Sequence, residues 1–215
     1  MVQPDLSSKK PVQGRWLLIL TIAACVGVEG SLQLANHLEL SPRLRATFYE
    51  YGGFWVGLLH HWQPNYTAQP YAMFLSYGFL HSGPVHLVVN MITLWSLGYA
   101  VLARVGVAGF SLLYLGTMIG GAAGYALLAS GPSLMVGASG ALFGLAGGLL
   151  AWDFIDRRAD RDSLRPVLAT LAILVGLNVV LWWVLAGQLA WQTHLGGLVA
   201  GGILAPLIDR HPRML

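Results

Sequence analysis

Four polar residues in otherwise apolar stretches have side chains suited to nucleophilic catalysis. Ser139 is of the nucleophile type and His194 of the base type, while His86 and Asn90 can donate hydrogen bonds. A serine hydroxyl becomes a useful nucleophile when a histidine lies within hydrogen-bond reach, and nearby donors stabilise the charge that develops on a carbonyl oxygen. Ionisable and polar groups inside a membrane are costly and are therefore functional candidates. This chemistry requires that the chain brings Ser139 and His194 together.

The composition is that of a membrane protein. Of the 215 residues, 56% are hydrophobic and 10% are charged, whereas a soluble domain carries about 25% charged residues. So small a charged share cannot cover a soluble globule, and the apolar runs exclude disorder. The net charge of +3 forms no patch that would bind nucleic acid, and the single cysteine, Cys25, excludes an internal disulfide. The pair His60–His61 lacks an acidic or cysteine neighbour, so we predict no metal and no cofactor.

Six apolar stretches approach the length of about 20 residues that a membrane-spanning helix needs. We therefore predict an all-α membrane protein, a bundle of six transmembrane helices over residues 16–209. The first loop, about 36–80, is long and rich in aromatic residues, which favours a position in the membrane interface. The six stretches are Trp16–Ala35, Pro84–Ala103, Val105–Ala129, Ala138–Trp152, Pro166–Ala186 and Gln192–Ile208.

Basic residues predict the orientation of these helices. Six helices place all but Arg43 and Arg45 of the 12 basic residues on one side. The positive-inside rule then makes the segments 1–15 and 210–215 cytoplasmic. Together with the lack of an organelle-type presequence, this predicts a multi-pass protein of a bacterial inner membrane. As an alternative, the stretch that ends at Cys25 resembles a lipoprotein cleavage site, although the apolar run continues past it.

The rise of a helix places the candidate residues at one depth. Ser139, His194 and Asn90 each lie 14 or 15 residues from the charged residue that ends their helix. At 1.5 Å per residue this is roughly 21–23 Å from the cytoplasmic boundary, or about 8 Å below the opposite surface of a ~30 Å core. His86 lies one turn above Asn90 on the same face. Three helices thus bring a nucleophile, a base and a donor to one layer.

Glycines at four-residue spacing accompany the serine and the histidine. Gly144 and Gly148 follow Ser139, and Gly197 and Gly201 follow the histidine. This spacing lets membrane helices approach closely, which a serine–histidine hydrogen bond between the fourth and sixth helices needs. Ordinary helix packing produces the same pattern, so the glycines alone do not indicate catalysis.

Three motifs resemble those of the rhomboid family of intramembrane serine proteases. They occur in order on the second, fourth and sixth predicted helices, within a resemblance that runs over about residues 71–207. The segment Phe79–Ser82 also resembles the family lead-in to the second helix. The motifs are His86–Asn90 for His-x-x-x-Asn, Gly137–Gly140 for Gly-x-Ser-Gly, and His194–Gly201 for His-x-x-Gly-x-x-x-Gly.

The resemblance implies roles for these residues. Ser139 would be the nucleophile and His194 its general base, a dyad without an acidic third member. His86, Asn90 and the backbone N–H of Ser139 would form the oxyanion hole. Phe143 stands where some relatives have a tyrosine under the histidine ring, and it can pack there but cannot hydrogen-bond. The supporting positions are Gly137, Gly140, Phe143, Gly197 and Gly201.

The implied reaction is hydrolysis of a peptide bond in or near a transmembrane segment of another membrane protein. The partners would be transmembrane protein substrates and the lipid bilayer, and a substrate helix must unwind locally before the serine can attack. A second reading is a catalytically silent relative that binds transmembrane helices as a chaperone or sorting factor. A small transporter is less favoured, because the sequence has neither an inverted repeat nor a charged pathway.

Some positions depart from the family pattern or have other expected roles. Tyr71–Ala72 stands where many members have Trp-Arg in the first loop, and Leu102 replaces an acidic residue at the cytoplasmic end of the second helix. Both departures concern loop anchoring and stability rather than the dyad. We expect His81 to tie the first loop to the core and Glu29 to be structural. Trp182–Trp183 would face lipid or a substrate gate between the second and fifth helices.

Overall fold

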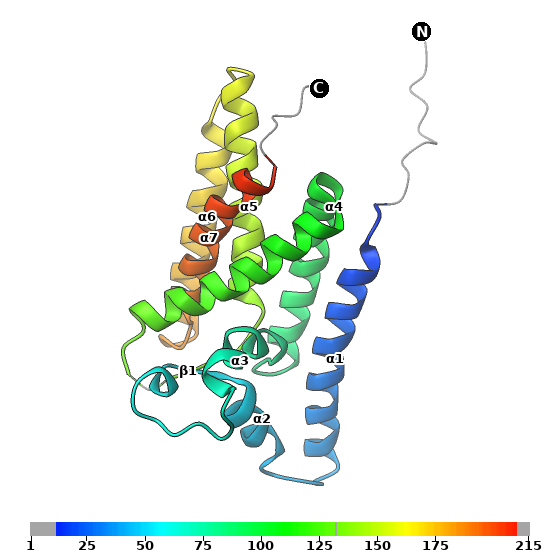
Figure 1. The fold of residues 1–215 in the computed structure, drawn as a ribbon, viewed down its shortest axis with the longest axis vertical. Helices are drawn as coiled ribbons and strands as arrows, with labels where there is room; N and C mark the ends of the chain where they lie inside the picture. Colours follow the sequence, from blue (N-terminus) through cyan, green and yellow to red (C-terminus); the bar gives the residue numbers. More distant parts are fainter. Residues whose placement is uncertain (1–11, 132, 210–215) are drawn as a thin grey trace.

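The computed structural model describes residues 12–131 and 133–209 (Figure 1). Most of the predicted cytoplasmic segment 1–15 and the tail 210–215 lie outside these residues. The described chain is mainly helical, with short helices and one pair of strands in the first loop and before α5. In chain order the elements are α1 (Arg15–His37), α2 (Leu44–Gly52), β1 (Phe54–Trp55), η1 (Val56–Leu59), α3 (Gln69–Ser76), η2 (Tyr77–Phe79), α4 (Pro84–Leu128), β2 (Leu134–Met135), α5 (Ser139–Ala159), α6 (Arg165–Val184) and α7 (Trp191–Ile208).

The long helices α1, α4, α5, α6 and α7 correspond to the predicted apolar stretches. Helix α4 covers both the second and the third stretch in one run of 45 residues that bends at Gly106, where φ is 67°. Glycine adopts a positive φ without the steric cost of a Cβ atom. By length and composition α1, α4 and α6 are able to cross a membrane. The prediction of an all-α membrane protein is confirmed, while the count of six spans stays a prediction.

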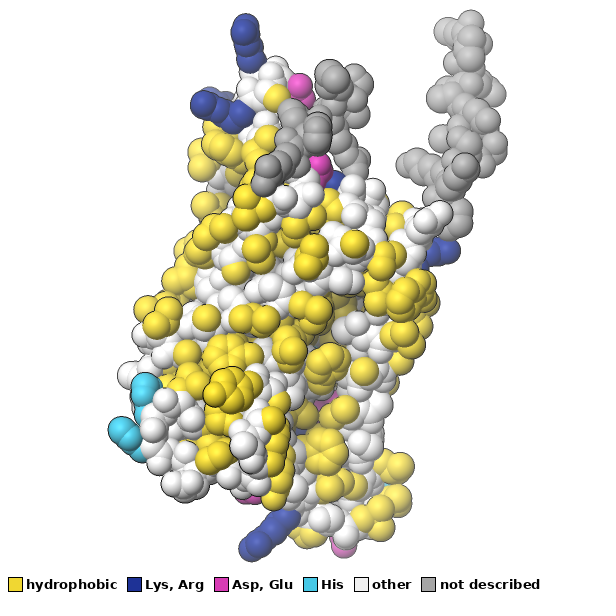
Figure 2. Space-filling model, viewed as in Figure 1, with side chains coloured by type: hydrophobic (Ala, Val, Ile, Leu, Met, Phe, Trp, Pro, Cys, Tyr) yellow, Lys and Arg dark blue, Asp and Glu magenta, His cyan; other side chains and the backbone are white. Residues whose placement is uncertain are grey.

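The ends of the bundle differ in what they contain. In Figure 1 the bend of α4, the α5–α6 connection and the end of α7 lie at one end, and the first loop lies at the opposite end. Figure 2 shows apolar side chains over the middle of one face, with arginines toward its ends. The bend of α4 and the α5–α6 connection with its flanking turns, which hold Arg104 and four further arginines, share one end of the molecule (Figure 1). The assignment of this end to the cytoplasm stays a prediction.

An ion-pair cluster ties three helices together at the end that holds the bend of α4. Arg104 contacts Asp156 of α5 at 2.6 Å and Asp209 after α7 at 2.9 Å. Leu102, which stands where the rhomboid pattern has an acidic residue, is buried in the hydrophobic core. The carboxylates that anchor this end thus come from α5 and from the end of α7, not from α4.

Helix α7 packs against the backbones of α5 and α4. A methyl group at Gly197 or Gly201 would overlap the carbonyl oxygens of Gly140 and Gly144 of α5. On the other side, a methyl group at Gly124 of α4 would lie 2.7 Å from a Cα atom of α7. The predicted close approach of the helices that carry the serine and the histidine is therefore confirmed.

The first loop packs onto the core through aromatic rings. Phe54 is fully buried, and its ring lies 5.0 Å from that of Phe74, 6.2 Å from Tyr77 and 6.0 Å from Tyr125, measured between centroids. Phe54 also pairs with Met135 in the antiparallel β1–β2 contact. The first loop is thereby attached to the segment that leads into α5.

Helix α1 is continuous through Cys25 to His37. Cys25 is fully buried, and its Sγ lies 3.9 Å from the carbonyl oxygen of Gly78. Processing at Cys25 would remove the first half of a helix that packs on the core. This arrangement weighs against the lipoprotein alternative.

Candidate active site

The segment before α5 holds Ser139 at the start of that helix. The backbone N–H of Gly137 donates to the carbonyl oxygen of Tyr77 at 2.9 Å, which attaches this segment to the first loop. Gly137 has a φ of 124°, and a side chain there would meet the ring of His86. Ser139 is the first residue of α5, so it lies at the positive end of the helix dipole, which favours a nearby anion.

Ser139 and His194 form a hydrogen bond between α5 and α7. The His194 Nε2 lies 2.8 Å from the Ser139 Oγ. His194 is 5% exposed, so the bond is shielded from the surroundings. The glycine contacts between α5 and α7 allow this distance, because their Cα atoms leave no bulk between the two backbones.

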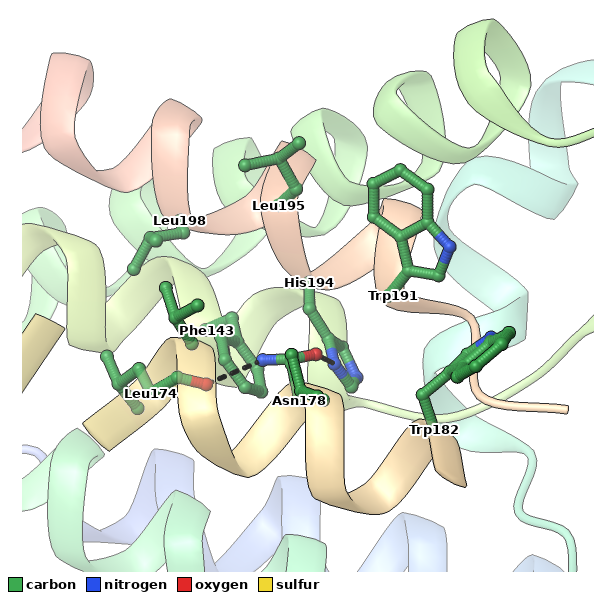
Figure 3. A pocket seen from close by; sticks show the side chains of 10 residues that line it. Phe143, Leu174, Asn178, Trp182, Trp191, His194, Leu195 and Leu198 are labelled. Carbon is green, nitrogen blue, oxygen red and sulfur yellow. Dashed lines mark hydrogen bonds between the residues drawn. The ribbon is translucent and has the colours of Figure 1, made fainter. Parts of the chain in front are cut away.

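Two further side chains hold the imidazole of His194 (Figure 3). The Phe143 ring stacks on it, with centroids 4.2 Å apart and an interplanar angle of 7°. This confirms the packing expected of Phe143. The Asn178 Oδ1 of α6 lies 2.6 Å from the His194 Nδ1. Asn178 was not among the candidate residues singled out from the sequence. The signal that could have found it is that an amide within an apolar helix needs a hydrogen-bond partner.

His86 and Asn90 reach the segment before Ser139 from the first turns of α4. Ser82 contacts the His86 Nδ1 with its backbone N–H at 3.3 Å and with its hydroxyl at 2.8 Å. Since a backbone N–H only donates, the Nδ1 accepts, and in the neutral ring the proton is on Nε2. That Nε2 lies beside Gly137. The buried Nδ2 of Asn90 has no hydrogen-bond partner among the described residues. The Asn90 Nδ2 is therefore an unused donor within the described residues, and the His86 Nε2–H is a second donor at this place.

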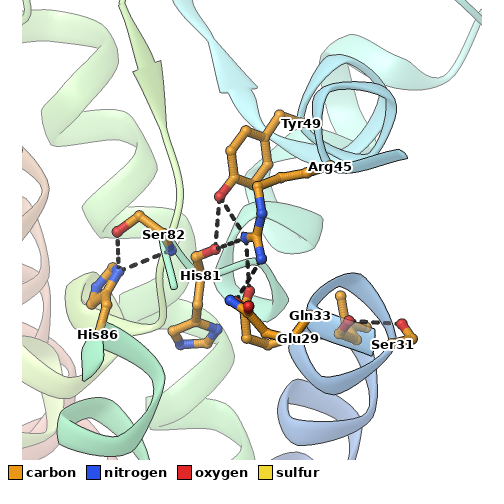
Figure 4. A network of polar contacts seen from close by, with 9 residues as sticks. Glu29, Ser31, Gln33, Arg45, Tyr49, His81, Ser82 and His86 are labelled. Atoms are coloured by element: carbon orange, nitrogen blue, oxygen red, sulfur yellow. Dashed lines mark hydrogen bonds and ion pairs between the residues drawn. The ribbon is translucent and has the colours of Figure 1, made fainter. Parts of the chain in front are cut away.

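A charged network anchors the first loop next to α4 (Figure 4). The Arg45 guanidinium of α2 contacts Glu29 of α1 at 2.7 Å, and Glu29 is 1% exposed. Arg45 Nη1 and the Tyr49 hydroxyl donate to the carbonyl oxygen of His81 at 3.1 and 2.8 Å. The hydrogen bond with Glu29 raises the pKa of Arg45 above its ordinary value. Tyr71, in contrast, is 80% exposed, so its side chain does not attach the loop to the core.

A cavity of about 360 Å³ lies beside His194 between α5, α6 and α7. Its walls are mostly apolar, and they include the side chains of Asn178 and Trp182 (Figure 3). Trp183 lies outside it and is 78% exposed. None of its lining residues comes from α4, so a role of Trp182–Trp183 at a gate between α4 and α6 stays a prediction.

The arrangement has the parts that an acyl-transfer reaction requires. A hydroxyl is hydrogen-bonded to an imidazole that is held by stacking and by a second hydrogen bond. The Asn90 amide, whose Nδ2 has no partner among the described residues, and the start of a helix lie close by. Such a set can remove a proton from the serine and stabilise an oxyanion.

Comparison with known proteins places the chain in a family. The Rhomboid domain family matches residues 68–211. RHOMBOID-like protein 4 of Arabidopsis thaliana is 38% identical over 130 residues, or 60% of this chain and 32% of that protein. Rhomboid protease GluP of Bacillus subtilis is 33% identical over 122 residues, or 57% of this chain and 23% of that protein. The matches thus span less than half of these relatives. The chain belongs to the rhomboid family.

Proposed function

We propose that the protein is an intramembrane serine endopeptidase that hydrolyses peptide bonds in or near transmembrane segments of other membrane proteins. The observation that carries this proposal is the 2.8 Å separation of the His194 Nε2 and the Ser139 Oγ. The name of one relative, Rhomboid protease GluP, supports the same activity. Because the dyad lies among apolar helices, its substrates are expected to reach it from the bilayer.

In the proposed mechanism Ser139 and His194 act as nucleophile and general base. His194 takes the hydroxyl proton as the Ser139 Oγ attacks the scissile carbonyl carbon. His86 Nε2–H, Asn90 Nδ2–H and the Ser139 backbone N–H donate to the resulting oxyanion. The C–N bond then breaks, and His194 returns the proton to the leaving amine. Water attacks the acyl ester by the same steps in reverse, which releases the acid and regenerates Ser139.

The membrane setting determines the class of substrate. A transmembrane helix has its backbone groups hydrogen-bonded within the helix, so its carbonyl carbon is accessible only after local unwinding. We expect substrates with helix-weakening residues near the cleaved bond. The predicted placement in a bacterial inner membrane, with residues 1–15 and 210–215 in the cytoplasm and the membrane domain over 16–209, is part of this proposal.

Labelling with a fluorescent fluorophosphonate tests the proposal without a known substrate. We expect the detergent-solubilised wild type to be labelled, and Ser139→Ala and His194→Ala to remain unlabelled although folded. Folded wild type that takes no label would overturn the protease proposal and favour a silent relative that binds transmembrane helices. Label that persists in Ser139→Ala would show that another residue is the nucleophile.

A further inference from the structure

Asn178 of α6 contacts the catalytic histidine with a defined orientation of its amide. Its Nδ2 donates to the carbonyl oxygen of Leu174 at 3.0 Å, one turn earlier in α6. Its Oδ1 lies 2.6 Å from the His194 Nδ1. The opposite orientation of the amide would place Oδ1 against the Leu174 carbonyl oxygen, and two acceptors there would repel each other. The oxygen of Asn178 therefore faces His194 (Figure 3).

This orientation determines which nitrogen of His194 has the proton. An amide oxygen only accepts, so the His194 Nδ1 must donate. In the neutral ring the Nε2 then has a free lone pair. This Nε2 is the atom that lies 2.8 Å from the Ser139 Oγ. A histidine tautomer is set by the hydrogen bond that its other nitrogen makes. The Asn178 contact thus selects the form of His194 that can accept a proton from Ser139.

Helix α6 has few other attachments to the bundle. Val167 is its only buried residue within the described chain. Near Asn178, Leu177 and Val179 are both exposed at the protein surface. Among residues 12–131 and 133–209, the contact with His194 is the only hydrogen bond that joins an α6 side chain to another helix. Asn178 therefore links a loosely packed helix directly to the general base.

We propose that Asn178 is a positioning residue, the third member of a Ser139–His194–Asn178 hydrogen-bond chain, which we call the relay. Asn178 holds the productive tautomer of His194 while α6 is docked on α7, and the amide itself takes up no proton. This inference rests on the proposed function and extends it, because the rhomboid resemblance implies a dyad. Displacement of α6 removes the partner of Nδ1, and the imidazole can then carry its proton on the nitrogen that faces Ser139. Activation of the serine is coupled in this way to the position of α6.

Kinetic comparison of variants tests the positioning role. Asn178→Leu keeps the size of the side chain but removes the acceptor, and we expect the rate of fluorophosphonate labelling to fall about 10-fold or more. Asn178→Asp keeps an acceptor for Nδ1–H and is expected to label much faster than Asn178→Leu. The matched control is Ile173→Leu, because Ile173 lies on the exposed surface of α6. We expect this variant to be labelled at the wild-type rate. Equal rates for Asn178→Leu and the wild type, or an equal loss in Asn178→Leu and Asn178→Asp, would overturn the proposal.

Nitrogen NMR of histidine-labelled protein measures the tautomer itself and needs neither substrate nor turnover. We expect the His194 signals, assigned by their loss in His194→Gln, to show the proton on Nδ1 in the wild type. In Asn178→Leu the proton is expected to shift toward Nε2. A wild-type His194 with its proton on Nε2 would overturn the proposal even if Asn178→Leu does not fold.

The two measurements separate this inference from the proposed function. A wild type that never cleaves a peptide, but whose His194 tautomer depends on Asn178, would contradict the protease function and retain the positioning role. A wild type that cleaves peptides, with a tautomer and labelling rate unaffected by Asn178→Leu, would retain the protease and contradict the relay.

Discussion

Gly201 of α7 lies against the backbone carbonyl of Gly144 of α5, with no space between them for a methyl group. The neighbouring Gly202 has no atom within 4 Å of the position that its Cβ would occupy. The two glycines share one helix and nearly one depth, and they differ in whether a second helix touches them. They therefore separate the effect of close helix packing from that of glycine itself.

We predict that Gly201→Ala destabilises the protein, whereas Gly202→Ala does not. The added methyl forces α5 and α7 apart, and overpacking of this kind costs about 1–3 kcal/mol. At Gly202 alanine only improves helix propensity, by up to about 1 kcal/mol. Thermal unfolding in detergent, followed by circular dichroism, measures both. Equal unfolding temperatures for the two variants would contradict the packing described for α7.

Replacement of Asn90 is predicted to impair the chemistry without loss of stability. The Asn90 Nδ2 has no partner among the described residues, so Asn90→Leu removes no hydrogen bond of that group. If the Nδ2 donates to the oxyanion, the rate of fluorophosphonate labelling falls about 10²–10³-fold. Thr93→Val on the same helix serves as control and should label like the wild type. An unchanged rate in folded Asn90→Leu would remove Asn90 from the oxyanion hole.

Loss of the Phe143 ring is predicted to slow the reaction moderately. Phe143 stacks on His194 at 4.2 Å, and aromatic pairs contribute about 1 kcal/mol beyond their buried area. Phe143→Ala should therefore reduce the labelling rate about 5-fold, while Phe143→Tyr keeps the ring and most of the rate. Equal labelling rates for Phe143→Ala and Phe143→Tyr would contradict the stacking role.

The stability of the protein is predicted to fall in acid because of His81, in the loop before α4. Burial, with a smaller effect of His86, lowers the pKa of His81 from 6.5 to about 4. Its side chain is fully buried, and neither ring nitrogen makes a well-formed hydrogen bond within the described residues. The fold thus favours the neutral ring. Above pH 6.5 the folded and unfolded chains are both neutral there, so the group has no effect on stability.

Between pH 6.5 and about 4 the unfolded chain binds a proton that the folded chain does not. The free energy of unfolding therefore decreases over this range, by about 3 kcal/mol in total from this group. Unfolding temperatures of the wild type and His81→Phe between pH 7 and 4 measure the effect. We expect a shallower pH dependence in the variant, and parallel curves would show that His81 makes no such contribution.

The site was predictable where local patterns determine position. Ser139 and His194 lie in apolar stretches whose charged ends set their depth, and the glycines after them indicate which helix faces touch. Neither argument needs knowledge of a distant contact. The same patterns predicted the long helices. The bend at Gly106 was an exception, because Arg104 indicated only a boundary between two apolar stretches.

The contacts of Asn178 and Arg45 were not predictable in this way. Helix α6 is apolar on all sides, so its pattern does not define which face meets α7. Arg45 lies in a loop of irregular structure, and its partner Glu29 is on a different element. A signal did exist for this second contact. A glutamate within a spanning helix needs a cation, and Arg43 and Arg45 were the only basic residues expected on that side.

The most direct test of the central claim is cleavage of transmembrane peptides by the protein in vesicles. Purified wild type and Ser139→Ala would be reconstituted with a library of transmembrane peptides that carry helix-weakening residues, and products would be identified by mass spectrometry. The account predicts products whose new ends lie in or near the membrane segment, formed by the wild type and absent with Ser139→Ala. Identical products from both proteins, or none from wild type that reacts with fluorophosphonate, would contradict it.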